Sequence, residues 1–516
     1  MSENFFQPRN IPRPKQIPRQ YFSNLYNLFD KIYGHIILSD ILTATNTKLH
    51  RHYNNQVKPF SSSELRTGIG MLIYASVKKR VNESLSDLFA ECKKYKMLDD
   101  YEILSENRFK YFRVAFDFGI DDYTLFEGEE HRFINTKVKI WPMYQKFNKI
   151  TGNYSDFSSP KGCAVDESLR RSFGGQDSTK RFNPSKPSKY GQQNQCLTAA
   201  DNMIVSVIPD LDSHSKLYGS CGELLTKLFP VKLHNTGITC SVDNWYTSRE
   251  SVEFLIKMKV RFIGTLKKNR LGPFFGAVVP DVFDYKAQRN EEFRRRMYVY
   301  RHVLCDTAID IIAYYDKKKV PPVIFVTNCQ NLFQDYSNLP HQTQYLPGQT
   351  KPSFVLFYNF TMGGVDDADW SMNKWSLSFR SQNSKNEWTH FSKRQLTNFL
   401  DIVLHNLFIL TKKNKIANNE TISKSFRHDW QVQLALDFFI KKPRAPTIPK
   451  DPRPLSEIQN LITVNSAKKR KSNSSTPSSP STPTSPTVLL SEIYSVRRNC
   501  ELCPKQKGVR PKRTTC

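Results

Sequence analysis

The spacing of apolar and polar positions changes along the 516-residue chain. Between residues 21 and 155, apolar residues recur every three or four positions, as at Leu65, Ile69 and Leu72, which is typical of amphipathic helices. Between residues 162 and 269, short apolar runs of strand length alternate with helical stretches. The pattern therefore predicts a mainly helical segment followed by an α/β segment.

Two short motifs predict where helices begin. Ser61 and Glu64 have the spacing of a capping box, in which each side chain accepts a hydrogen bond from the backbone N–H of the other residue. Thr247 and Glu250 repeat that spacing ahead of further apolar positions. We therefore expect helices to start beside Ser61 and Thr247.

The α/β segment opens with three apolar runs that predict strands. These runs cover residues 163–165, 196–200 and 203–208. Asp201 and Asn202 favour a hairpin turn between the last two. A helix and two strands are then expected over 222–229, 237–242 and 262–266. Three antiparallel strands followed by alternating helix and strand is the order of an RNase H-like α/β core.

The pattern becomes looser beyond residue 272. Strands are expected over 297–304, 310–315, 323–326 and 354–358. Gly363 and Gly364 then favour a turn, after which a helix is expected to open at Asp366. A further amphipathic helix over 396–410 is expected to pack against the helical segment.

The composition adds a strong excess of positive charge. Lys and Arg number 76 against 48 Asp and Glu, which gives a formal net charge of +28. Such a charge suits a polyanionic partner, because each neutralised phosphate releases condensed counterions. A ribosome-associated or merely basic protein has the same composition, so the charge alone does not identify the partner.

Cysteine usage and apolar run lengths indicate the compartment. Seven of the ten cysteines lie among apolar runs, where a free cysteine behaves as a small buried hydrophobe, and this favours a reducing environment. The N-terminus lacks the apolar centre of a signal peptide, and no apolar stretch is long enough to span a membrane. We therefore expect neither secretion nor a membrane partner.

Low-complexity sequence follows residue 441. A basic cluster at 468–471 precedes a Ser/Thr/Pro tract at 472–487, which has too few apolar residues to order itself. The cluster is either a nuclear import signal or a solvated group of charges. We favour import and hence a nuclear location.

Three aspartates are the strongest candidates for chemistry. Asp166 and Asp243 follow apolar strand-like runs, and Asp366 stands at the expected helix start. Carboxylates gathered from distant parts of a chain can hold two Mg²⁺ (or Mn²⁺) ions, which prefer hard oxygen ligands. Asp369, three residues beyond Asp366, shares its helical face and is a fourth candidate ligand. Aspartate also commonly ends strands and caps helices, and for any one of these residues alone that explanation would prevail.

The sequence around the aspartates is more specific than the aspartates themselves. The contexts read VDESL at 165–169, NPSKPSKYG at 183–191, VDNWYTS at 242–248 and GGVDDAD at 363–369, with IGMLIY at 69–74 and LSENRF at 104–109 upstream. In this order and spacing they resemble the piggyBac-type DDE transposases, over roughly residues 20 to 415. The resemblance implies an RNase H-like catalytic core with a helical N-terminal domain, an insertion domain and a disordered C-terminal tail.

The resemblance also implies a function. A piggyBac-like chain would be a Mg²⁺-dependent enzyme of cut-and-paste DNA transposition, with Asp166, Asp243 and Asp366 as catalytic metal ligands. It would nick element ends, form and open a hairpin, and join the ends to TTAA-type targets. Its partners would be double-stranded DNA, both transposon ends and target, and a second copy in a homodimer.

Several residues are expected to contact DNA. Lys186, Lys189 and Tyr190 lie in the proline-stiffened motif at 183–191, where lysines can hold phosphates. Arg380, Lys385 and Trp388 lie in a segment that matches a basic region of the similar family, and Trp388 is a candidate for stacking on an unpaired base. An exposed basic turn is the simpler explanation for the lysines, and core packing is the simpler one for tryptophans such as Trp245.

Pattern and resemblance together give a domain organisation. We expect a flexible basic arm over 1–20 and a helical dimerisation and DNA-binding domain over 21–155. The first part of the core is expected over 156–270, the insertion domain over 271–350, and the last part of the core with a helical DNA-binding region over 351–440. A disordered linker with the basic cluster over 441–495 and a truncated cysteine-rich zinc module over 496–516 are expected to follow.

The C-terminus leaves two interpretations open. Cys500, Cys503 and Cys516 resemble the first half of the family's zinc domain, but a structural zinc site takes four ligands, so any site here is partial or shared between protomers. A chain without a full module could instead be a transposon-derived nuclear DNA-binding protein that no longer transposes. A metal-dependent nuclease without strand transfer is a third alternative.

Overall fold

The computed structural model of the chain describes residues 11–78, 85–94, 99–118, 131–157, 162–171, 180–184, 189–210, 218–275, 279–280, 283, 296–316, 320–330, 343–345, 351–377 and 388–442. The chain divides into a unit spanning residues 1–443 and a second unit spanning 444–516, and all described residues belong to the first.

Helices from both ends of this first unit form one layer. They are α1 (Leu25–Phe29) between the short 3₁₀ helix η2 (Arg19–Ser23) and the short π-helix η3 (Asp30–Gly34), then α2 (His35–Tyr53), α3 (Ser62–Lys78), α4 (Leu85–Lys94), α5 (Glu106–Ala115), α6 (His131–Thr151) and α12 (Phe426–Phe438). The Arg66 guanidinium of α3 donates to the backbone carbonyls of Asp437 and Phe438, at 2.6 and 3.0 Å. The late helix α12 therefore completes the early helical domain, beside the two-stranded ladder of β1 (Tyr101–Glu102) and β12 (Ile440–Lys441).

The predicted capping box at Ser61 is present. The Glu64 N–H donates to the Ser61 hydroxyl at 3.1 Å, and the Ser61 N–H donates to the Glu64 carboxylate at 2.9 Å. The same carboxylate pairs with the Arg108 guanidinium at 2.8 Å, which ties the start of α3 to α5. At the other predicted box the helix α8 (Arg249–Lys257) is capped by Ser248, whose hydroxyl accepts from the Ser251 N–H, and not by Thr247.

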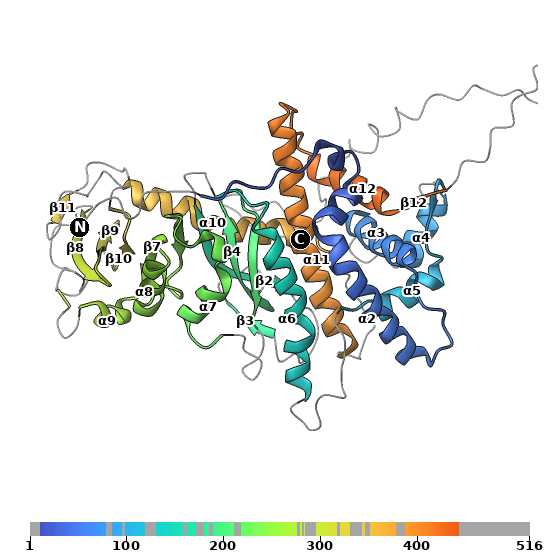
Figure 1. Cartoon of the computed structure of the whole chain (residues 1–516), viewed down its shortest axis with the longest axis horizontal. Coiled ribbons are helices and arrows are strands. Elements are labelled where there is room, and N and C mark those ends of the chain that lie inside the picture. The colour runs from blue at the N-terminus through green and yellow to red at the C-terminus, as the bar shows by residue number, and fades with distance from the viewer. Residues whose placement is uncertain are drawn as a thin grey trace, which may run out of the picture. The chain divides into compact units, whose positions relative to one another are not determined.

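A mixed ten-stranded sheet forms the second layer (Figure 1). Its first part is β2 (Cys163–Arg171), β3 (Lys180–Phe182), β4 (Tyr190–Ala199), β5 (Ile204–Pro209), β6 (Thr239–Val242) and β7 (Arg261–Leu266). Strands β2, β4 and β5 are antiparallel neighbours, whereas β6 pairs with β2, and β7 with β6, in parallel. This is the predicted RNase H-like order.

Helical segments connect these strands. They are α7 (Cys221–Leu228), η5 (Val231–Leu233), α8 (Arg249–Lys257), η6 (Lys268–Arg270) and α9 (Gly272–Phe275). The predicted helix over 222–229 corresponds to α7, and the predicted hairpin turn joins β4 to β5, with Asn202 at a φ of 66°. Asparagine tolerates this left-handed conformation better than most residues.

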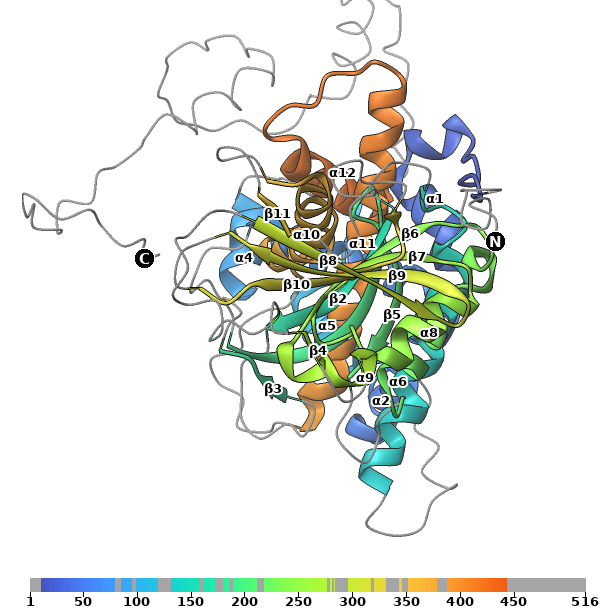
Figure 2. The same cartoon turned by 90° about the vertical axis from the view of Figure 1, so that its left-hand side faces the viewer.

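The strands beyond residue 295 extend the same sheet. They are β8 (Arg296–Leu304), β9 (Thr307–Tyr315), β10 (Val323–Thr327) and β11 (Thr343–Tyr345), and β10 pairs antiparallel with β7. Figure 2 shows β8, β9 and β10 in front of the earlier strands, with the strand direction turning progressively across the sheet. The predicted strands over 297–304, 310–315 and 323–326 are thus present.

Two long helices cover the sheet, and one of them corrects the sequence analysis. The helix α10 (Ser353–Lys374) is continuous, so the predicted strand over 354–358 and the turn at Gly363 and Gly364 are wrong. Phe354, Thr361 and Val365 are buried at helical spacing along α10. The helix α11 (Trp388–Ala417) includes the predicted helix over 396–410, and its Phe399 ring packs against Phe118 and Phe147 of the helical layer, as expected.

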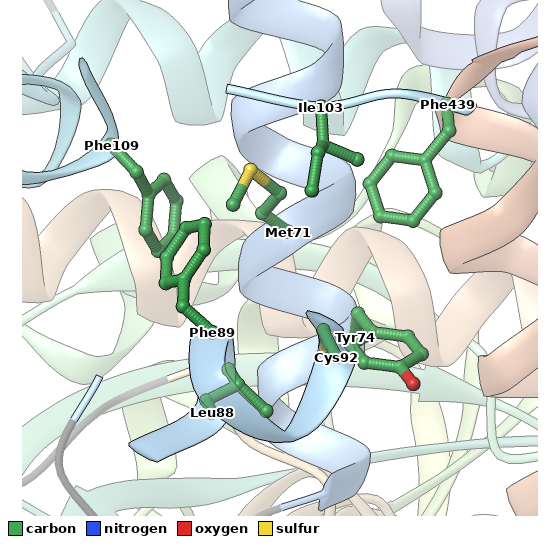
Figure 3. A pocket seen from close by; sticks show the side chains of 8 residues that line it. All are labelled: Met71, Tyr74, Leu88, Phe89, Cys92, Ile103, Phe109 and Phe439. Atoms are coloured by element: carbon green, nitrogen blue, oxygen red, sulfur yellow. The ribbon is translucent and has the colours of Figure 1, made fainter. Parts of the chain in front are cut away.

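A small apolar cavity of about 20 Å³ lies within the helical layer (Figure 3). Its lining comes from α3, α4, the segment between β1 and α5, α5 itself and the segment after α12, and consists of Met71, Tyr74, Leu88, Phe89, Cys92, Ile103, Phe109 and Phe439. This volume has room for about one water molecule and not for a substrate-sized ligand. The cavity is therefore a packing defect of the helical layer rather than a substrate site.

None of the described cysteines forms a disulfide, and five of them are buried: Cys92, Cys163, Cys196, Cys240 and Cys329. The burial of these five cysteines confirms the expectation that they act as small buried hydrophobes. Cys305 is exposed, because it occupies the β8–β9 turn at a φ of 49°.

In the part of the chain that the structure describes, no helix is both long and apolar enough to cross a bilayer.

Candidate active site

Two of the predicted aspartates follow the last registered pair of two adjacent strands. In the parallel pairing of β2 and β6, Val165 lies opposite Val242, and the next residues are Asp166 and Asp243. Residues in register on neighbouring strands are about 4.8 Å apart and point to the same face of the sheet. Folding therefore places side by side two carboxylates that are far apart in the sequence. Asp166 lies inside β2 and not at its end as predicted, because the strand continues to Arg171.

The next strand adds a hydroxyl to this row. Val242 pairs with Gly264 on β7, which puts Thr265 beside Asp243, and the Thr265 hydroxyl donates to Asp243 Oδ1 at 3.4 Å. The same hydroxyl is 3.2 Å from the Tyr358 hydroxyl of α10. Burial raises the pKa of Tyr358, and the carboxylates of Asp243 and Asp166 raise it further. The phenol therefore stays protonated and lies close to both acids.

The loop after β6 is held in place by an arginine that the sequence did not single out. The backbone N–H of Asn244 donates to Asp243 Oδ1, and the Thr247 hydroxyl donates to the Asp243 carbonyl at 3.0 Å. Arg270 Nη1 donates to the carbonyls of Asn244, Trp245 and Thr247 at 2.9, 2.8 and 3.1 Å. These contacts fix where the Asp243 carboxylate lies. Trp245 itself is half-buried with its ring against Tyr246, in agreement with a packing role.

The third aspartate is carried by α10, which crosses the face that bears the first two. Thr361 of α10 shares a hydrogen bond with Ser241 of β6, and Asp369 accepts hydrogen bonds from the Ser168 hydroxyl and, at 2.9 Å, from the Leu169 N–H of β2. Asp366 is exposed and lies one helical turn before Asp369. It is therefore on the helix that covers Asp166, near the point where that helix is tied to β2.

Asp369 has a clear structural role. It is only 7% exposed, and its carboxylate joins α10 to β2 through the two contacts just described. Burial raises the pKa of the Cys196 thiol, and the carboxylates of Asp369 and Asp166 raise it further, so both acids lie close to the same sulfur atom. A metal-ligand role for Asp369 stays a prediction. Asp367 is exposed within α10 rather than at a helix start, and it accepts from the Asn202 amide at 3.2 Å.

The donor set suits a hard divalent cation, since it consists of carboxylates with hydroxyl neighbours. Within the described residues, however, no group of three or more His, Cys, Asp or Glu side chains lies close enough together to hold a metal ion. The structure brings Asp166 and Asp243 together and places Asp366 on the adjacent helix, without closing the three into one ligand set.

The residues expected to contact DNA are only partly described. Lys189 and Tyr190 lie at the end of the β3–β4 hairpin and are exposed, as a DNA contact requires. Phe182, which the sequence analysis missed, pairs across the hairpin with Tyr190; the side chains are 57% and 51% exposed and their ring centroids are 4.8 Å apart. The only sequence signal for Phe182 was its position as an apolar residue directly before the polar motif at 183–191.

Other predicted site residues lie outside what the structure describes. They are Lys186, Arg380, Lys385, Cys500, Cys503 and Cys516. Trp388 begins α11, but its side chain is not among those described. Their predicted roles stay predictions.

The two adjacent glycines of α10 give a matched pair of tests. A Cβ atom at Gly364 would lie 3.0 Å from the Thr198 hydroxyl of β4, whereas one at Gly363 would have no neighbour within 4 Å. We expect Gly363→Ala to stabilise the protein by about 0.5–1 kcal/mol, because alanine loses less backbone entropy in a helix. Gly364→Ala should instead be destabilising, by about 1 kcal/mol, since α10 must move away from β4. Urea unfolding measures both, and equal shifts would show that α10 does not pack closely on β4.

His405 of α11 joins α10 to the β4–β5 turn and should make stability depend on pH. Its ring nitrogens lie 3.0 Å from the Asn202 carbonyl and 3.4 Å from the Ser371 hydroxyl. Burial, together with the nearby charges of Arg427 and Arg170, lowers the pKa of His405 to about 4. Between the ordinary value near 6.5 and about pH 4, the unfolded chain binds a proton that the folded chain does not.

Folding stability should therefore fall as the pH drops through that window, by up to about 1.4 kcal/mol per pH unit from this group. Unfolding free energies measured across the window for the wild type and His405→Gln should differ in slope. The exposed His52, changed to Gln, is the control and should keep the wild-type slope. A His405→Gln curve parallel to the wild type would contradict the assignment.

The family now follows from comparison with known proteins. The family described as Transposase IS4 matches residues 25–408, and the chain belongs to this family of transposases. A solved structure, "Cryo-EM structure of piggyBac transposase synaptic complex with hairpin DNA (SNHP)", is similar with a TM-score of 0.63 and 19% identity, over 94% of this chain and 92% of that one. This likeness shows the shared fold. No curated protein matches the chain. The resemblance seen in the sequence is thus confirmed for family and fold.

Proposed function

We propose that the chain is a metal-dependent DNA transposase whose catalytic acids are Asp166, Asp243 and Asp366. The observation that carries this proposal is the register of β2 and β6, which places Asp166 beside Asp243 on one face of the sheet. The transposase family membership supports the same function. Two carboxylates packed so closely repel each other unless a cation or proton lies between them.

The surrounding residues set the chemistry of the site. The acids would hold two divalent cations, Mg²⁺ or Mn²⁺, which supply activation of the nucleophile and neutralisation of the charge on the departing oxygen. Thr265 and the backbone N–H of Asn244 orient the Asp243 carboxylate, and Arg270 fixes the loop that carries it. Tyr358, held protonated, can donate a hydrogen bond to a phosphate oxygen beside the acids.

The proposed reaction is two successive displacements at phosphorus. Water first attacks a phosphodiester at an element end, the bond from phosphorus to the 3′-oxygen breaks, and a 3′-hydroxyl and a 5′-phosphate result. That hydroxyl then attacks the opposite strand, so one phosphodiester bond forms as another breaks and no energy source is needed. We propose that this second step forms a hairpin and that, after the hairpin opens, the ends join to TTAA-type targets.

The β3–β4 hairpin is the proposed DNA contact among the described residues. Exposed Lys189 provides charge for phosphates, and the exposed Phe182 and Tyr190 rings provide apolar surface at the same edge of the sheet. The net charge of +28 supports binding to double-stranded DNA, both element ends and target. A nuclear location and a homodimer that holds two ends belong to the same proposal.

One observation favours the alternative of a DNA-binding protein that no longer transposes. Among the described residues, no three acids lie close enough together to hold a metal ion, so Asp166, Asp243 and Asp366 do not form one ligand set. For catalysis, the three acids must come together when cations bind.

A nicking assay separates the two functions. Linear duplexes that carry the genomic DNA flanking the coding region are incubated with the protein and Mg²⁺, or with EDTA as the control, and strand breaks are read by denaturing electrophoresis. Nicks that require Mg²⁺ and then yield hairpins support the transposase. Salt-dependent binding without nicks would establish the DNA-binding alternative, and nicks without strand transfer would indicate a nuclease.

A further inference from the structure

The outer face of α10 exposes a tryptophan. Trp370 is 68% exposed, although tryptophan is usually among the more buried residues. The opposite face of the same helix packs on the sheet through buried Val365, Ala368 and Met372. Trp370 is therefore not needed to hold α10 in place.

Trp370 lies next to the candidate active site. It follows Asp366 by four residues, which on a helix means one turn further, about 6 Å along the axis and on the same side. A group bound at Asp366 and a planar group against the Trp370 ring would be neighbours.

The ammonium group of Lys374 lies beside the Trp370 ring. Lys374 Nζ lies 5.1 Å from the centroid of Trp370 and 5.5 Å from that of Trp375, within the range of a cation–π interaction. Lys374 is itself exposed. An aromatic face with an adjacent cation matches a nucleotide, whose base can stack while its phosphate meets the charge.

The other exposed apolar residues of α10 do not join Trp370 in one patch. Leu356 and Phe360 are 55% and 58% exposed, but Phe360 precedes Trp370 by ten residues, about 15 Å along the helix. Asp366, Asp367 and the bare position at Gly363 lie between them. Charged residues are depleted from the centres of protein–protein interfaces, so this face suits a nucleotide better than a protein partner.

We propose that Trp370 stacks on an unpaired base of DNA held at the Asp366 side of the site, with Lys374 against the adjoining phosphate. The inference deepens the proposed function by assigning unpaired DNA as a ligand beside the acids. Trp370 is then a positioning residue, which holds the strand without taking part in bond making.

Binding without metal tests this inference apart from catalysis. Fluorescence anisotropy in EDTA measures the affinity for oligothymidine and for a blunt duplex. Trp370→Ala should weaken oligothymidine binding by roughly 5- to 100-fold, the range for loss of one stacked base, and should change duplex binding little. Trp370→Phe should retain most of the affinity, and Phe360→Ala, an exposed aromatic on the same helix, is the matched control and should bind as the wild type does.

The outcomes remain separate from those of the nicking assay. Unchanged oligothymidine affinity in Trp370→Ala, or an equal loss for duplex and single strand, would overturn the inference whether or not the protein nicks DNA. Reduced self-association in sedimentation, with unchanged DNA affinity, would also overturn it and identify this face as a protein interface. If Trp370→Ala loses affinity for the single strand alone and the protein never nicks DNA, the stacking role of Trp370 is supported and only the proposed enzymatic activity is rejected.

Discussion

Asp243→Asn is expected to reduce Mg²⁺-dependent strand nicking by roughly a thousand-fold or more, because several kcal/mol of charge stabilisation in the transition state would be lost. Asparagine keeps the size of aspartate and an oxygen that can accept from Thr265 and the Asn244 N–H, but it removes the negative charge that a cation requires. Rates of nicking on the flanking-DNA duplexes provide the measurement.

Asp166→Asn and Asp366→Asn should give losses of the same order. Asp367→Asn is the matched control, because Asp367 neighbours Asp366 on α10, is exposed, and accepts a hydrogen bond from the Asn202 amide, which an asparagine oxygen can also accept. Its activity should stay within a few-fold of the wild type. Full activity in any one of the three acid variants would remove that residue from the catalytic set.

Asp401→Ala is expected to be the most destabilising single change, at about 3–5 kcal/mol, since it leaves a buried guanidinium without its counter-charge. Asp401 of α11 pairs with Arg170 of β2, and the two side chains are 2% and 1% exposed. The same carboxylate accepts from the Ser376 hydroxyl and the Leu377 N–H, each at 2.8 Å. One side chain thus joins β2, α11 and the segment after α10.

Chemical unfolding of Asp401→Ala, read by circular dichroism, measures this loss. Arg170→Met combined with Asp401→Leu should be less destabilising than Asp401→Ala alone, because the double change removes both charges and fills the space. Lys415→Met breaks an exposed pair with Glu420 and should cost less than about 1 kcal/mol. A loss of that small size in Asp401→Ala would mean that the Arg170 pair does not hold β2 to α11.

The regular elements could be predicted from the sequence wherever their pattern is local. The capping box at Ser61 and the hairpin at Asn202 depend on residues a few positions apart, and both are present. The length of β2 could not be predicted, because Ser168 and Arg170 are polar residues on a buried strand. Their partners, Asp369 and Asp401, come from helices more than 200 residues later.

The error at α10 has a similar cause. Residues 354–358 form a short apolar run, which periodicity alone cannot assign to strand or helix. Two glycines then favoured a turn, whereas Gly364 lies within the helix where α10 approaches Thr198 of β4. Close packing between distant segments, and not local backbone preference, determines this helix.

The order of the aspartates was predictable, but their geometry was not. The motifs around Asp166 and Asp243 predicted two strands, and their parallel register in the sheet puts the two acids side by side. Arg270 and Thr265 orient Asp243 from the following strand and turn, yet no local motif marks either of them. Residues that position a catalytic group can be recognised only from their contacts in the folded chain.

The most direct test of the account is a crystal structure of the protein soaked in Mn²⁺, with ions located from their anomalous scattering. The account predicts Mn²⁺ between Asp166 and Asp243, with an oxygen of Asp366 also within about 2.2 Å of an ion. A crystal that binds Mn²⁺ at other sites but holds no ion at these carboxylates would contradict a catalytic role for the three aspartates.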